Sequence, residues 1–90
     1  MVTLFVRHSF ADYDAWRTVY DEVESRHAEL GIRGAAVYRT VDNPNEVTVT
    51  HEFDDAETAR AFIDGETIRS AMERAGVTGE PEVWFGTASG

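Results

Sequence analysis

Cysteine is absent from the 90-residue chain. This absence excludes disulfide bonds, thiolate nucleophiles, and zinc or iron–sulfur sites that depend on cysteine ligands. Any chemistry that the chain performs has to use histidine, tyrosine, carboxylate, hydroxyl or arginine side chains. We expect no cofactor.

Basic residues and long apolar runs are also scarce. The chain has 8 Lys and Arg residues against 17 Asp and Glu residues, a net charge of −9, which repels a phosphate backbone, so no nucleic-acid partner is expected. No apolar run approaches the roughly 18 residues of a membrane helix, and the N-terminus lacks the features of a signal peptide. We therefore expect a cytoplasmic protein with no membrane partner and a single domain, residues 1–90.

The first third of the chain predicts a strand and a helix. Val2–His8 alternates aliphatic with mixed residues, as a strand covered on both faces does. Asp12 stands where a helix N-cap belongs and Gly31 where a left-handed C′ residue belongs, so a helix is predicted to end at Leu30. One stripe at spacings of three and four marks its inner face: Tyr13, Trp16, Tyr20, Val23, His27 and Leu30.

The middle of the chain predicts a hairpin. Arg33–Thr40 is rich in small and β-favouring residues, and Val41–Asn45 is dense in turn formers. Glu46–Phe53 alternates most clearly of all the segments. Its inner face is predicted to hold Val47, Val49, His51 and Phe53.

The last third predicts a broken helical region and a final strand. Asp54 or Asp55 caps the helical region, Gly65 interrupts it, and Gly76 follows its end. Val83–Thr87 is predicted as the last strand.

This order is βαββαβ, the α+β ferredoxin-like arrangement, in which two right-handed crossovers put both helical regions on one face of a four-stranded antiparallel sheet. The other face is left bare. It carries polar residues together with Phe5, and Trp84 is a further candidate for it. A homodimer that packs these faces together is our hypothesis.

Three segments, VRHSFADYDAW, YRTVDNPNEV and EFDDAETARAF, resemble the dimeric α+β barrel superfamily, specifically small proteins grouped with antibiotic-biosynthesis monooxygenases and polyketide cyclases. The resemblance spans nearly the whole chain. It is specific for fold and not for reaction, because the superfamily includes cofactor-free monooxygenases, cyclases, isomerases and haem-degrading enzymes. Monooxygenase members often carry a Pro-His-Phe-like segment in the broken second helix. This chain has Gly65, Glu66, Thr67 and Ile68 there, so that histidine has no counterpart.

All three histidines, His8, His27 and His51, fall in the apolar register of their elements and should point between helices and sheet. His8 and His51 are candidate catalytic acids or bases because imidazole titrates near neutral pH; the alternative is a structural role. They should lie at opposite ends of the sheet, about 20 Å apart, which is too far for a catalytic pair. His27 and His51 lack an evident third ligand, so no metal site is predicted.

The substrate-binding candidates are mostly aromatic side chains around these histidines, although burial in a core selects the same stripe. They are Tyr13, Trp16, Tyr20, His27, Tyr38, Phe62, Met72 and Trp84. The registers of Tyr38 and Trp84 are unresolved, and the dimer face is their alternative place.

The residues and the resemblance together favour a cofactor-independent enzyme acting on a small hydrophobic molecule, aromatic or polyketide-like, with His8 or His51 moving a proton. Cyclisation or isomerisation is favoured over oxygenation. The alternative is a non-catalytic dimeric ligand-binding or accessory protein, and haem binding through a histidine is a third hypothesis.

Overall fold

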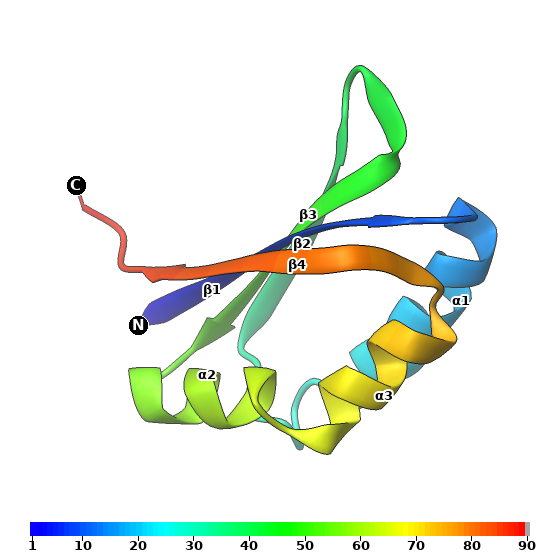
Figure 1. Ribbon diagram of the computed structural model, residues 1–90. Helices are drawn as coiled ribbons and strands as arrows, with labels where there is room; N and C mark the ends of the chain where they lie inside the picture. Colours follow the sequence, from blue (N-terminus) through cyan, green and yellow to red (C-terminus); the bar gives the residue numbers. More distant parts are fainter. Residues whose placement is uncertain (90) are drawn as a thin grey trace.

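The computed structural model describes residues 1–89 as one antiparallel sheet with helices packed on one of its faces (Figure 1). The elements are β1 (Val2–Phe10), α1 (Tyr13–Glu24), β2 (Gly34–Thr40), β3 (Asn43–Phe53), α2 (Ala56–Ile63), α3 (Glu66–Arg74) and β4 (Val77–Gly86). The strand order β2-β3-β1-β4 confirms the predicted ferredoxin-like topology. Within residues 1–89, no helix is long and apolar enough to cross a membrane.

The two central strands present their apolar residues to the helices. In β3 the four residues predicted to face inward are buried, and the residues between them are only partly so. In β1 the buried positions are Leu4, Val6, His8 and Phe10, so the alternation continues two residues past the predicted end of the strand. This alternation places both strand histidines on the helix side of the sheet.

Helix α1 begins where the sequence predicts and ends earlier. The Asp12 carboxylate accepts a hydrogen bond from the Ala15 N–H at 2.9 Å, which confirms the N-cap. The predicted end at Leu30 is wrong, because the helix stops at Glu24 and residues 25–31 form successive turns. The Ser25 hydroxyl donates to the Glu22 carbonyl at 2.6 Å, a local bond of the kind that competes with helix continuation.

Two other boundaries differ from the prediction, and the structure selects one of the two predicted caps of the second helical region. The hairpin turn is shorter than Val41–Asn45, because Thr40 pairs with Asn43. Residues 44–46 of β3 bulge out of the β2–β3 ladder. The helix cap is Asp55, whose side chain accepts from the Thr58 N–H. Strand β4 begins at Val77, well before the predicted Val83. An edge strand with a bulge tolerates Gly79 and Pro81.

The core lies between the sheet and the helices. One cluster of buried side chains joins α1 and α3 to β3, and a second joins α2 to β1 and β3. Within residues 1–89, no helix covers the opposite face of the sheet (Figure 1). On that face the Phe5 and Trp84 rings stack 5.4 Å apart and nearly parallel.

Candidate functional site

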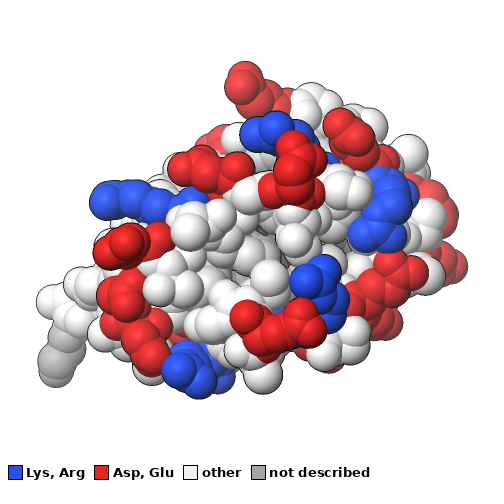
Figure 2. All heavy atoms as spheres, turned by 90° about the horizontal axis from the view of Figure 1, so that it is seen from below, with Lys and Arg blue, Asp and Glu red and all other residues white. Residues whose placement is uncertain are grey.

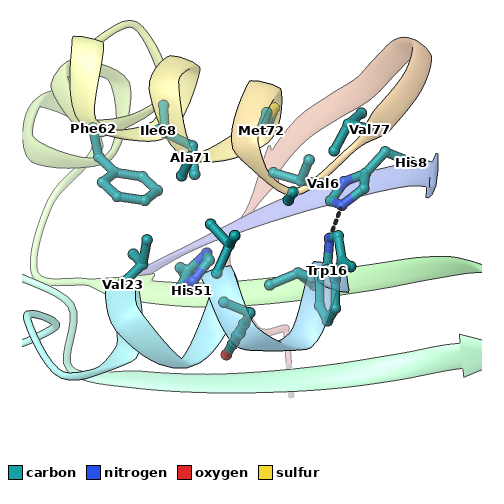
Figure 3. A pocket seen from close by; sticks show the side chains of 14 residues that line it. Val6, His8, Trp16, Val23, His51, Phe62, Ile68, Ala71, Met72 and Val77 are labelled. Atoms are coloured by element: carbon teal, nitrogen blue, oxygen red, sulfur yellow. Dashed lines mark hydrogen bonds between the residues drawn. The ribbon is translucent and has the colours of Figure 1, made fainter. Parts of the chain in front are cut away.

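An apolar cavity of about 50 Å³ lies between the sheet and the helices. Figure 3 shows His51, Phe62 and Val23 toward one end, and His8, Trp16 and Met72 toward the other. Viewed from the helix side, charged side chains surround an uncharged, recessed centre (Figure 2). The histidines are therefore the main polar groups in a site with apolar walls.

His8 is held by a hydrogen bond from the first helix. The indole Nε1–H of Trp16 donates to His8 Nε2 at 2.8 Å, and both side chains are buried. Because an indole N–H can only donate, Nε2 is the unprotonated nitrogen and the neutral ring carries its proton on Nδ1. That Nδ1 is buried and has no hydrogen-bond partner within residues 1–89.

His51 belongs to an aromatic cluster at the other end of the cavity. Its ring stacks on Tyr20 with centroids 6.3 Å apart, and lies 5.3 Å from both the His27 and the Phe62 rings. His51 Nδ1 and His27 Nε2 are buried and lack partners in the described part of the chain. Residues 1–89 contain no group of three side chains that could hold a metal ion.

Burial keeps these histidines neutral. Loss of solvation lowers the pKa of His8 from 6.5 to about 4. Burial also lowers the pKa of His51 to about 4, with a smaller contribution from the neighbouring His27. The pKa of His27 is lowered by burial as well, and the charge of Glu24 opposes that shift. At neutral pH both cavity histidines are uncharged rings with one donor and one acceptor nitrogen.

The spacing of the two cavity histidines differs from the prediction. His51 pairs across the ladder with Leu4, and His8 pairs with Val47, so the two are offset by four residues, about 13 Å along the strands. The predicted separation of the two histidines was too large. Neither histidine lies at the end of the sheet, because both strands continue two residues beyond their histidine. The two rings are not in direct contact, yet they line the same cavity.

The structure separates the substrate-binding candidates into two groups. Trp16, Tyr20, Phe62 and Met72 line the cavity with His8 and His51, whereas the other four candidates do not: Tyr13, His27, Tyr38 and Trp84.

The four candidates outside the cavity lie in two places. Tyr13 packs against the Phe10 and Trp16 rings, with the Arg39 guanidinium 3.9 Å from its centroid, and His27 lies behind His51. A place for Tyr38 or Trp84 in the cavity is wrong, because they are 61% and 40% exposed and pair with Thr48 and Phe5 of the uncovered sheet face. The register of β2 and β4 decides this, and their sequences did not determine it.

The sequence-based candidates did not include the aliphatic residues that line the cavity. Four α1 and sheet residues and four from α3 to β4 complete the lining: Val6, Val19, Val23, Val49, Ile68, Ala71, Ala75 and Val77. The signal was present in the sequence, since Ile68, Met72 and Ala75 recur at helical spacing after Gly65. Sequence alone does not distinguish a stripe that fills a core from one that borders a cavity.

Comparison with solved structures shows the same fold. A protein from Bordetella bronchiseptica, provisionally assigned as an antibiotic biosynthesis monooxygenase, superposes with a TM-score of 0.83 at 10% identity, over 98% of this chain and 96% of that one. SnoaB, a cofactor-independent oxygenase from Streptomyces nogalater, superposes with a TM-score of 0.78 at 18% identity, over 99% and 93%. At these identities the similarity shows the fold alone, the α+β ferredoxin-like βαββαβ arrangement.

The sequence also matches a family model. Residues 3–74 match the model for antibiotic biosynthesis monooxygenases, and the chain belongs to this family. Among curated proteins no sequence matches.

Proposed function

We propose that the protein is a cofactor-independent enzyme in which His51 removes a proton from a hydrophobic aromatic substrate bound in the cavity. The observation that carries this proposal is a pair of buried, uncharged imidazoles with unpartnered nitrogens in an apolar cavity. A buried polar atom without a partner is costly, so a ligand that supplies the missing hydrogen bonds is favoured.

The hydrogen bonds support different roles for the two histidines. His8 has no free lone pair, because Nε2 accepts from Trp16 and Nδ1 carries the proton. It can therefore donate to an acceptor on the substrate and orient it. His51 has a free lone pair on one ring nitrogen and is the candidate base. The register offset keeps His8 too far away to act on the same atoms.

The reaction that fits this arrangement is enolisation of an aromatic ketone. His51 takes a proton from the carbon next to the carbonyl, and the C–H electron pair moves onto the carbonyl oxygen. Cyclisation, isomerisation and cofactor-free oxygenation all can start from that enolate. SnoaB is a cofactor-independent oxygenase, and by analogy the enolate here would be oxidised by dioxygen, R₂CH₂ + O₂ → R₂C=O + H₂O.

The proposal is tested with 2-tetralone, an enolisable aromatic ketone, in D₂O. Exchange of its α-protons is followed by NMR and oxygen uptake with an electrode. We expect the wild-type protein to accelerate exchange. His51→Gln should lower kcat by about 10²-fold or more, while His8→Gln should act mainly on KM.

Glu73→Gln, on the exposed side of α3, is the matched control and should behave as wild type. Exchange that His51→Gln leaves at the wild-type rate would contradict the assignment of the base. No acceleration by the wild-type protein would count against enolisation itself.

One observation favours a second candidate, a ligand-binding protein without turnover. A pKa of about 4 makes both cavity histidines weak bases at neutral pH. In that case the Gln variants would change binding of 2-tetralone, and no variant would exchange its protons faster than buffer.

The proposal includes a homodimer formed through the uncovered sheet face. Phe5 and Trp84 stack there, and Trp84 is 40% exposed in the isolated chain. Stacked aromatic rings on an otherwise polar face are typical of an interface core, where aromatic residues are enriched. The dimer would cover this face without closing the cavity, which lies between the sheet and the helices.

A further inference from the structure

Two residues of α3 separate the histidine cavity from a second hollow. Ile68 and Met72 line the cavity of about 50 Å³, and they also line a groove of about 500 Å³ that runs between the helices and β4. They lie four positions apart, so they occupy the same side of α3 on successive turns. Their side chains are the shared wall of the two spaces.

The volumes show why this wall matters. A cavity of about 50 Å³ holds a few water molecules, and it is smaller than the cavities of roughly 150 Å³ that accept benzene. Binding sites for larger organic ligands measure roughly 300–1,000 Å³. The groove reaches that size and the cavity does not. An aromatic ligand therefore needs the shared wall to move.

Helix α3 is the helix best suited to move. Its N-cap is Gly65, which provides no side-chain hydrogen bond, whereas α1 and α2 are capped by Asp12 and Asp55. Only one α3 residue, Ala71, is buried, compared with four in α1. The unbranched side chain of Met72 can adopt several rotamers at low cost.

The sheet is also interrupted at this place. The β1–β4 ladder runs in register from Thr3 to Arg7, is broken opposite His8, and resumes at Ser9. The extra β4 residues 79–81 form a bulge, and Glu80 and Pro81 of that bulge line the groove. The groove therefore lies beside the strand position of His8, and Met72 lines the cavity toward the same end as that histidine (Figure 3).

We propose that Met72, supported by Ile68, is the wall that sets ligand size, and that its displacement joins the histidine cavity to the β4 groove in one binding site. The ligand is the aromatic substrate of the proposed function. The wall itself is tested without catalysis, so failure of either idea can be recognised separately.

The first test uses the absence of cysteine. In a Trp84→Phe background, Trp16 is the only tryptophan, and its quenching by acrylamide reports access to the cavity. Met72→Cys shortens the wall. Methyl methanethiosulfonate then restores a side chain of roughly methionine length, and dithiothreitol removes it again. We expect quenching to rise several-fold with the free thiol, to fall after methylthiolation and to rise again on reduction.

The control is Val83→Cys, which lines the groove and not the cavity. Its modification should leave Trp16 quenching unchanged. If Trp16 quenching is the same in the free, methylthiolated and reduced states of Met72→Cys, the role of Met72 is overturned. The same holds if modification of Val83→Cys changes Trp16 quenching as much as modification of Met72→Cys does. Each comparison is made within one variant, so the amino-acid substitution is the same in all three states.

The second test asks whether the cavity opens into the groove. In Met72→Ala/Val83→Cys, on the same Trp84→Phe background, N-phenylmaleimide on the thiol fills the groove. We expect this label to reverse most of the increase in Trp16 quenching caused by Met72→Ala. Quenching that stays high after complete labelling would show that access lies elsewhere, for example between α1 and α3, and would overturn the joined site.

Discussion

The contact between Trp16 and His8 is the most informative residue-scale feature of the site. A buried imidazole can present either nitrogen, and the indole donor selects one tautomer. The bond from Trp16 therefore leaves His8 as a hydrogen-bond donor through Nδ1, whereas the sequence alone allowed either an acid or a base. His51, which has no such donor, keeps its lone pair available for proton transfer.

Both cavity histidines should make stability depend on pH. Their pKa is about 4 in the folded protein and near 6.5 when unfolded, so the unfolded state binds more protons below pH 6.5. Stability is fully present above pH 6.5 and falls as the pH drops toward 4. At pH 5 each histidine should cost about 2 kcal/mol of unfolding free energy relative to pH 7.5.

Urea denaturation of the wild-type protein and of His8→Gln/His51→Gln, at pH 7.5 and pH 5, measures this difference. Carboxylates contribute equally to both proteins and cancel. The double variant should lose less stability than wild type on acidification. A loss as large as that of wild type would mean that neither ring is buried in its neutral form.

At the scale of elements, the start of α1 depends on one hydrogen bond. Asp12→Ala removes the acceptor for the Ala15 N–H and should lower the unfolding free energy by about 1 kcal/mol. Asp12→Asn keeps an acceptor and should remain within a few tenths of a kcal/mol of wild type. Thermal and urea denaturation of the two variants provide the measurement. If asparagine is as destabilising as alanine, the carboxylate acts through its charge on the helix dipole.

The ends of elements were harder to predict than their existence. The stripe on α1 continues to His27 and Leu30, which still pack inward although the backbone there has left the helix. Side-chain periodicity reports which residues face the core, and a series of turns can preserve that facing. The start of β4 was missed because Val77 and Thr78 pair with β1 beyond a bulge, and that bulge contains Gly79 and Pro81, which have weak strand preference.

At the scale of the whole molecule, the uncovered sheet face predicts a dimer. Light scattering at tens of micromolar should give twice the 10.1 kDa chain mass. Trp84→Arg puts a charge into the proposed interface core and should give the mass of one chain. Glu73→Arg also introduces an arginine, here on the helix side, and should leave the dimer intact. A wild-type mass of 10.1 kDa would contradict the dimer.

Local patterns in the chain were enough to predict the order of elements, the inward face of each central strand and the capping of α1. Alternation and helical spacing encode which residues face the core, and the caps are local hydrogen bonds. The Trp16–His8 bond, the four-residue offset between the histidines and the place of Met72 between cavity and groove emerged only when the chain was folded. These depend on strand register and on the volume left between packed side chains, which no local pattern in the chain specifies.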